Sequence, residues 1–359
     1  ALLHARDAYR AAAAGPRFAS RDPLGQLPLR ARLDAGGAGA AAGVGGGDEG
    51  AGRFMAAVAR YYRGGGGDDV LNGDDGDDII FGQGGFDVIN GGGGDDSIRG
   101  DAGADFLFGS DDDDTINGGG GNDSILGGLG DDLLIGGPGS NDTLDGGADW
   151  DMVDYDDSPS GVTVDLDLGT ASDGWGGTDT LISIERVYGS NYGDDVLTGD
   201  GADNSFYGRV GDDQLIGLGG NDYLRGDAGD DIIDGGEGND YADYQSDPAG
   251  VDFDLSDAVD GVLTVTDGYG DTDTLIDIER LAGTYHDDIL RGDAGDNSLR
   301  GYAGDDILDG GDGDRDAVDY YHAPDGVTVE LAAAYADGEV TVSDGWGDTD
   351  TLVSKFRQC

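Results

Sequence analysis

Residues 64–81 read GGGGDDVLNGDDGDDIIF, which divides into two nine-residue units, GGGGDDVLN and GDDGDDIIF. Each unit begins with glycine, carries aspartate at its sixth place and has one aliphatic residue, Leu71 or Ile80, at its eighth. Six further units follow without a gap to Ile135, and a ninth, with one inserted residue, ends at Leu144. A short repeat sustained in this way predicts a solenoid of stacked coils, because one aliphatic residue in nine cannot form an ordinary globular core.

The charge of the chain is as unusual as its repeat. Aspartate and glutamate number 77 against 19 lysine and arginine residues, which gives a net charge of −58, and 74 of the 359 residues are glycine. A nucleic-acid partner would require a basic face, so none is expected. The one cysteine, Cys359, excludes a disulfide within the chain, and no apolar run is long enough for a membrane span.

The nine-residue unit suits a tight turn followed by a short strand. Glycine at the first, second and fourth places permits positive φ, and the last three places suit a strand with only its middle side chain pointing inward. Two units would form one flattened coil of 18 residues, so that Asp69 approaches Asp87, two units on, rather than Asp78. Stacked strands lie about 4.8 Å apart, and the sixth-place carboxylates would approach to that spacing.

Carboxylates at this spacing oppose folding unless a cation lies between them. Two charges about 4.8 Å apart repel by roughly 3–4 kcal/mol at an effective dielectric of about 20, whereas burying one aliphatic side chain contributes roughly 2 kcal/mol. Calcium accepts about six to eight oxygen ligands in flexible geometry, and magnesium requires a tighter octahedron. Zinc prefers histidine and cysteine, of which the chain has three and one. We therefore expect several calcium ions, and an array that is loose or unfolded without them.

The unit resembles the G-G-x-G-x-D-x-U-x nonapeptide of RTX, or haemolysin-type, calcium-binding proteins of bacteria, over about residues 64–352. The resemblance implies an all-β fold, a parallel β-roll or β-solenoid in which carbonyls of the glycine turns and the sixth-place aspartates enclose calcium between coils. It also implies secretion through a type I channel, with folding outside the cell. By this similarity the calcium ligands are Asp69, Asp78, Asp87, Asp96, Asp105, Asp114, Asp123, Asp132, Asp142, Asp213, Asp222, Asp231, Asp240, Asp288 and Asp306.

Four positions depart from the pattern. Asp112 and His286 stand where the fourth-place glycine belongs, and Asn204 and Asn297 replace the sixth-place aspartate. We expect weaker calcium sites at these turns.

A longer repeat interrupts the nonapeptides three times. DGGADWDMVDY at 145–155 recurs at 234–244 and 309–320, and each copy continues through an alternating strand to DGWGGTDTL or a close variant. The predicted division is an N-terminal segment at 1–63, nonapeptide arrays at 64–144, 199–243 and 283–309, and longer repeats at 145–198, 244–282 and 310–359. Aromatic residues recur in the longer repeats as Tyr155, Tyr244 and Tyr320 and as Trp175, Tyr269 and Trp346. We expect these to be packing residues, with sugar stacking as the alternative.

The ends of the chain differ from the repeats. Residues 1–63 are rich in alanine, arginine and glycine and are predicted to be part linker and part helix, with helical patterns at 1–14 and 51–63. The second of these helices would cap the solenoid, with a partner-binding helix as the alternative. The third longer repeat breaks off at 355–359, which suggests a truncated chain.

No catalytic motif accompanies the repeats. The zinc-protease H-E-x-x-H, the lipase G-x-S-x-G and a complete EF-hand loop do not occur in the sequence. We therefore expect a non-enzymatic, calcium-dependent folding module of a secreted, extracellular protein, with any catalytic domain outside this chain. One alternative is the C-terminal secretion and folding module of a hydrolase or toxin. The other is an adhesin or matrix protein that binds glycans or another cell-surface partner.

Overall fold

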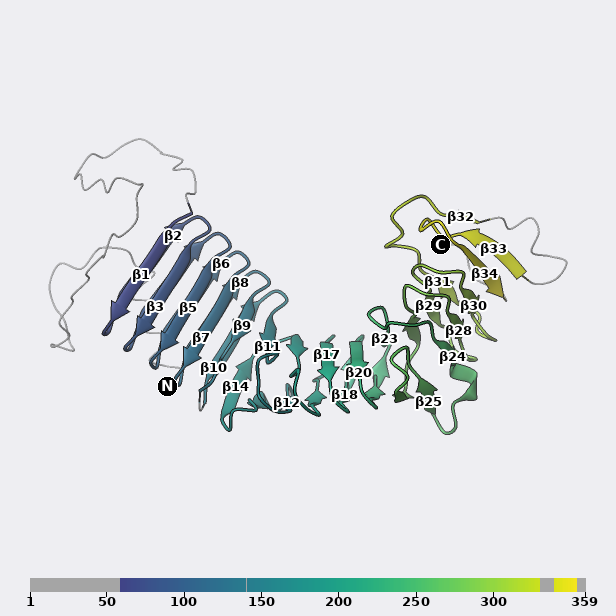
Figure 1. Ribbon diagram of the computed structural model, residues 1–359, viewed down its shortest axis with the longest axis horizontal. Helices are drawn as coiled ribbons and strands as arrows, with labels where there is room; N and C mark the ends of the chain where they lie inside the picture. The colour runs from purple at the N-terminus through teal and green to yellow at the C-terminus, as the bar shows by residue number, and fades with distance from the viewer. Residues whose placement is uncertain (1–58, 140, 330–338, 354–359) are drawn as a thin grey trace. The chain divides into compact units, whose positions relative to one another are not determined.

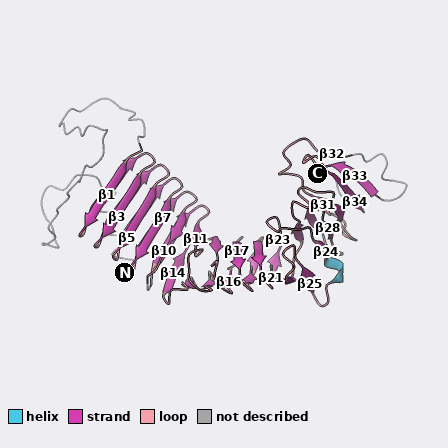
Figure 2. Cartoon of the chain, in the orientation of Figure 1, coloured by secondary structure: helices cyan, strands magenta, loops and turns pink. Residues whose placement is uncertain are grey.

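The computed structural model describes residues 59–139, 141–329 and 339–353, and the chain divides into two compact units. Unit 1 comprises the chain up to Val153 together with Asp179–Ile184, and unit 2 comprises Asp154–Thr178 and the chain from Glu185 onward. The described residues form β-strands and one 3-10 turn, η1 (Leu255–Asp257) (Figure 2). The all-β prediction is therefore confirmed.

Unit 1 is a regular stack of coils, seen as the row of nearly parallel arrows at the purple end of Figure 1. Its strands form two parallel sheets, in the orders β1-β3-β5-β7-β9-β11 and β2-β4-β6-β8-β10-β14. Ile80 pairs with Ile98, which confirms the coil of 18 residues. The strands are β1 (Tyr61–Gly66), β2 (Val70–Asp75), β3 (Ile79–Gly84), β4 (Val88–Gly93), β5 (Ser97–Ala102), β6 (Phe106–Asp111), β7 (Thr115–Gly120), β8 (Ser124–Leu129), β9 (Leu133–Ile135), β10 (Thr143–Ala148), β11 (Met152–Asp154) and β14 (Thr178–Ile182).

Unit 2 continues the same construction and adds antiparallel hairpins from the longer repeats. One sheet runs through β15 (Arg186–Tyr188), β17 (Ser205–Val210), β20 (Tyr223–Ala228), β23 (Tyr241–Asp243), β27 (Arg280–Ala282), β29 (Ser298–Arg300) and β31 (Ala317–Val318). A second runs through β13 (Thr170–Ser172), β12 (Thr163–Asp165), β16 (Val196–Thr198), β18 (Gln214–Ile216), β21 (Ile232–Asp234), β26 (Thr272–Ile276) and β25 (Val262–Thr266). A third contains β24 (Asp252–Asp254), β28 (Ile289–Arg291), β30 (Ile307–Asp309), β34 (Thr349–Val353), β33 (Glu339–Ser343) and β32 (Thr328–Val329), and β19 (Gly219–Gly220) pairs with β22 (Glu237–Gly238).

Strand length differs from the sequence prediction in unit 1. Most of its strands have six residues rather than three, because the ladder continues from the last three places of one unit into the first three of the next. Gln83, for example, pairs with Asp101 within the glycine-rich turn. In unit 2, strands such as β16, β18 and β21 have the three residues expected.

The start of the array also requires a correction. Tyr61–Arg63, placed at the end of a predicted helix, belong to strand β1, and Tyr62 pairs with Ile80 at the position of an eighth-place residue. The open edge of β3 binds this segment more favourably as a strand, because pairing satisfies its backbone groups. Residues 59 and 60 are described and are not helical. The predicted helix at 1–14, residues 51–58 of the second predicted helix, and the break at 355–359 lie outside the described residues.

The core is a narrow ladder of aliphatic side chains. The eighth-place residues Ile80, Ile98 and Leu107 are at most 1% exposed, and the longer repeats contribute Val164 and Phe253, which are fully buried. Since each coil of the regular array contributes only two such side chains, the turns at the two edges must supply part of the stability.

Candidate metal centres

The sixth-place aspartates form columns of buried carboxylates along the edges of the coils. The Asp69 N–H donates to Asp87 Oδ1 at 2.9 Å, and the Asp87 N–H donates in turn to Asp105 Oδ1 at 2.8 Å. Asp78 and Asp96 make the same contact at 2.7 Å on the other edge. The structure therefore confirms that Asp69 neighbours Asp87, two units on. The predicted ligands from Asp78 to Asp132 are at most 3% exposed, although they carry carboxylates.

The second oxygen of most of these carboxylates is buried without a hydrogen-bond donor. Burying an ionised oxygen without a donor or a cation is strongly unfavourable. The repetition of this feature in register marks a position where a positively charged group fits. The sixth-place residues concerned are Asp69, Asp78, Asp87, Asp96, Asp105, Asp114, Asp123, Asp132, Asp213, Asp222, Asp231, Asp240, Asp306 and Asp316.

Glycine at the first place keeps a space open beside that oxygen. A Cβ on Gly118 would lie 2.5 Å from Asp123 Oδ2 and 2.9 Å from the carbonyl oxygen of Gly136, in the next coil on the same edge. A Cβ on Gly64 would meet Asp69 Oδ2 at 2.5 Å and the Gly82 carbonyl oxygen at 2.8 Å. A carboxylate oxygen and a main-chain carbonyl therefore converge on the same space. This all-oxygen set suits a hard cation such as calcium.

The electrostatics of the columns favour bound cations or bound protons. Burial, reinforced by neighbouring carboxylates, raises the pKa of Asp87 to about 6 and that of Asp114 to about 8. In Asp231 the same causes raise the pKa to about 9. The described residues contain no group of three or more His, Cys, Asp or Glu side chains that could hold a metal ion. A cation at these turns would therefore need oxygens other than carboxylates, such as main-chain carbonyls.

Sequence reasoning missed several sixth-place residues that lie inside or beside the longer repeats. GGADWDMVD at 146–154 is itself a nonapeptide with Asp151 at its sixth place, and insertions of one residue displace Asp195 and Asp316. Asp132 N–H donates to Asp151 Oδ1 at 2.9 Å, as the regular register requires. Treating the longer repeats as interruptions concealed this continuity, which a search allowing one insertion would have found.

The DTDTL segments contribute three further aspartates to the columns. GYGDTDTLI at 268–276 keeps aspartate at the sixth place and leucine at the eighth, and Asp231 N–H donates to Asp273 Oδ1 at 3.0 Å. The counterparts in the other copies are Asp179 and Asp350. In two copies the second oxygen accepts from a tyrosine hydroxyl, which is Tyr244 on Asp273 at 2.9 Å and Tyr320 on Asp350 at 2.8 Å.

A separate aspartate begins each of these segments. Asp173 Oδ1 accepts from the main-chain N–H groups of Trp175, Gly176 and Gly177 at 2.8–2.9 Å, and Asp267 and Asp344 make equivalent loops. The other oxygen of Asp173, Asp267 and Asp344 is buried without a hydrogen-bond donor.

The recurring aromatics divide into two groups. Tyr155 and Tyr244 are buried, at 5% and 3% exposed, which agrees with the predicted packing role. Trp175 and Tyr269 are 44% and 43% exposed, so the packing prediction is wrong for these two side chains. They lie at the tip of the loop that Asp173 or Asp267 closes, where the chain has turned away from the core.

The match to a protein family agrees with this geometry. The family model described as RTX calcium-binding nonapeptide repeat (4 copies) matches residues 61–89, 73–107, 82–116, 108–141, 190–215, 207–242 and 283–315. A search of curated proteins found no match. Among solved structures, the extracellular lipase LipA from Serratia marcescens is matched with a TM-score of 0.21 and 18% identity, over 70% of this chain and 38% of the lipase chain. Among the described residues, no helix is long and apolar enough to cross a membrane.

Proposed function

We propose that this chain, which belongs to the RTX calcium-binding nonapeptide repeat proteins, is a module of a secreted protein that folds when calcium fills its stacked turns. The observation that carries the proposal is the series of buried sixth-place oxygens without hydrogen-bond donors. Each lies beside a first-place glycine, and in most of the turns a main-chain carbonyl oxygen faces the same space, which we call the cradle. Calcium supplies the positive charge that these oxygens need. The chain's own part is to hold the oxygens in register and to exclude water from them.

The proposed ligands are the sixth-place aspartates whose second oxygen is buried without a donor, together with carbonyls of the glycine turns. Asp142 and Asp151 are included among the proposed ligands because they occupy the same columns. Extracellular calcium modules bind in the range of about 10⁻⁴–10⁻³ M. Sites of that strength would be empty in a cytosol and filled outside the cell. This difference fits secretion of an unfolded chain, followed by folding on arrival.

The wider role that this supports is a folding and export module for a secreted protein, of which a hydrolase or a toxin is one class. The described residues are mostly repeat coils, whose buried side chains form ladders rather than an enclosed active site. An open reading frame that places a catalytic domain next to this module would support that role. A frame that encodes only further repeats would contradict it.

A glycan-binding role is the second candidate, and the exposed rings of Trp175 and Tyr269 favour it. Aromatic rings exposed at loop tips are suited to stacking against sugars. A glycan array probed in calcium with the unmodified chain and with a W175A/Y269A variant tests the idea. Equal signals from both would refute it, provided that the two proteins have the same circular dichroism spectrum.

Calcium-dependent folding is tested by circular dichroism and gel filtration in EGTA, in calcium and in magnesium at the same concentration. We expect the full β-rich spectrum and the most compact particle only with calcium, because magnesium gives up its water reluctantly. If the spectrum and the elution volume in EGTA match those in calcium, the proposed function is wrong.

A further inference from the structure

Outside the DTDTL segments, the nonapeptide turns are of two kinds, which differ at the second place of the unit. In the turns whose sixth-place oxygen is buried without a donor, the second-place residue has positive φ, even where it is not glycine. Examples are Gln83 at 82°, Asp101 at 71° and Arg209 at 84°. This left-handed conformation is unfavourable for residues with a side chain. It leaves the sixth-place oxygen free to meet a cation.

Four turns of the described chain have the other form. Their second-place residues, Ser190, Asp200, Thr284 and Asp293, are not among the residues with positive φ. In each, the main-chain N–H of that residue donates back to the sixth-place side chain of its own turn. The bonds are Ser190 to Asp195 Oδ2 at 2.6 Å, Asp200 to Asn204 Oδ1 at 2.9 Å, Thr284 to Asp288 Oδ2 at 2.6 Å and Asp293 to Asn297 Oδ1 at 2.9 Å.

At two of these turns a hydroxyl adds a second hydrogen bond. Ser190 Oγ lies 3.2 Å from Asp195 Oδ1, and Thr284 Oγ1 lies 3.1 Å from Asp288 Oδ1. Oδ1 of these two aspartates also accepts from the N–H of Val162 at 2.6 Å and of Val251 at 2.8 Å, respectively. Both oxygens of Asp195 and Asp288 therefore have donors from the protein itself. The other two turns carry asparagine, which removes the negative charge.

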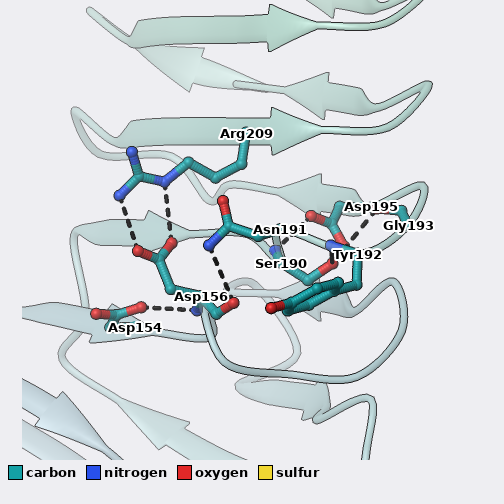
Figure 3. Close-up of polar contacts among 8 residues, drawn as sticks. All are labelled: Asp154, Asp156, Ser190, Asn191, Tyr192, Gly193, Asp195 and Arg209. Atoms are coloured by element: carbon teal, nitrogen blue, oxygen red, sulfur yellow. Dashed lines mark hydrogen bonds and ion pairs between the residues drawn. The ribbon is translucent and has the colours of Figure 1, made fainter.

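Residues outside the Ser190 turn also hold it in place through hydrogen bonds (Figure 3). Asn191 Nδ2 donates to the carbonyl oxygen of Asp156 at 3.1 Å, and the Asp156 carboxylate forms a two-bond ion pair with Arg209 at 3.0 and 3.2 Å. In the other copy, Gln245 Nε2 donates to the Tyr285 hydroxyl at 2.7 Å, which links the Thr284 turn to the same part of the longer repeat.

The position of these turns is systematic. They form two complete coils, 189–207 and 283–300, and each lies where a longer repeat gives way to the next nonapeptide array. We call them the closed coils. We infer that the closed coils take no calcium at their own turns and stay closed through Ser190, Thr284 and the two asparagines, so that the array binds calcium in separate blocks. The inference rests on the proposed function, and it removes Asp288 from the predicted ligands.

The test compares matched aspartates in closed and open turns. Asp288→Asn and Asp195→Asn change closed coils, and Asp306→Asn and Asp213→Asn change the next turn on the same edge, to which each is hydrogen bonded. Calcium bound at saturation is counted by atomic emission after gel filtration. We expect D306N and D213N each to lose about one ion relative to the unmodified chain, and D288N and D195N to lose none. Equal losses in both pairs would overturn the inference.

A second measurement uses the unmodified chain and does not depend on the variants folding. Hydrogen exchange followed by mass spectrometry, in calcium and in EGTA, reports on peptides from 189–207 and 283–300 and on peptides from 82–135. We expect calcium removal to speed exchange far more in the latter than in the closed coils. If exchange speeds up equally in both sets of peptides, the inference that the closed coils take no calcium is wrong, while the proposed calcium binding elsewhere in the chain still stands. A chain that binds no calcium at all would refute the proposed function instead.

Discussion

Replacing Gly118 with alanine is the sharpest single test of the proposed cradle. Gly118 is a first-place glycine whose φ is not in the left-handed region, so its backbone accepts alanine. The new Cβ would lie 2.5 Å from Asp123 Oδ2 and 2.9 Å from both Asp123 Cβ and the Gly136 carbonyl oxygen. Contacts this short force a shift, and the Asp123 side chain is the part able to move.

The cost follows from what that shift breaks. Asp123 Oδ1 accepts from the Asp105 N–H at 2.8 Å, and losing a buried hydrogen bond of this kind costs about 1–3 kcal/mol. Overpacking adds a strain of similar size, so we expect G118A to be destabilised by about 2–4 kcal/mol in calcium. We also expect it to lose about one bound ion, because the new methyl group occupies the cradle.

Gly120 in the same unit provides the matched control. A Cβ there would meet only ordinary contacts, the nearest being 3.5 Å from the Pro138 carbonyl oxygen. G120A should be neutral or more stable by about 0.4–1 kcal/mol, since alanine restricts the unfolded chain. The assay is urea unfolding in saturating calcium, with ion counting on both variants. If G118A binds as many ions as G120A and unfolds at the same urea concentration, the assignment of the cradle is wrong.

Three further predictions concern pH, the core and the longer repeats. Burial raises the pKa of Asp114 to about 8, above the unfolded value of about 3.9, so the calcium-free fold binds protons more tightly than the unfolded chain. Its stability should therefore fall as pH rises from about 4 to about 8, and the calcium concentration needed for folding should rise over the same range, because protons no longer stabilise the folded chain; a calcium midpoint that falls as pH rises would contradict this. Ile98→Ala should lower the free energy of unfolding by about 2–5 kcal/mol, measured by urea unfolding in saturating calcium, because Ile98 is 1% exposed. Val70→Ala, at a position 65% exposed, is the control and should change the stability little. Tyr244→Phe removes the hydroxyl group that donates to Asp273, and it should cost about 1–3 kcal/mol in the same assay. Tyr321→Phe, at a position 84% exposed, is the control. Equal urea midpoints for the two variants would show that the hydrogen bond from Tyr244 to Asp273 is not stabilising.

The regular array could be predicted almost completely from the sequence. The nine-residue period placed Ile80 and Ile98 in one ladder, placed Asp69 beside Asp87, and pointed to calcium. These features follow from local rules, because a repeat of identical units has one stacking register that buries every eighth-place residue. The ligand positions in the longer repeats were harder to predict. Their insertions shift Asp151, Asp195 and Asp273 out of a strict nine-residue count.

What only the tertiary structure decided is which carboxylates are left for a cation. Asp288 and Asp306 occupy the same place in the repeat, yet the oxygens of Asp288 accept from Thr284 and Val251, whereas Asp306 Oδ2 is buried without a donor. The difference depends on the φ of the second-place residue and on a donor 37 positions away in the chain. Composition and period fix neither of these. The sequence by itself determined that the chain is a solenoid with acidic turns, and the folded backbone determined which of those turns can take an ion.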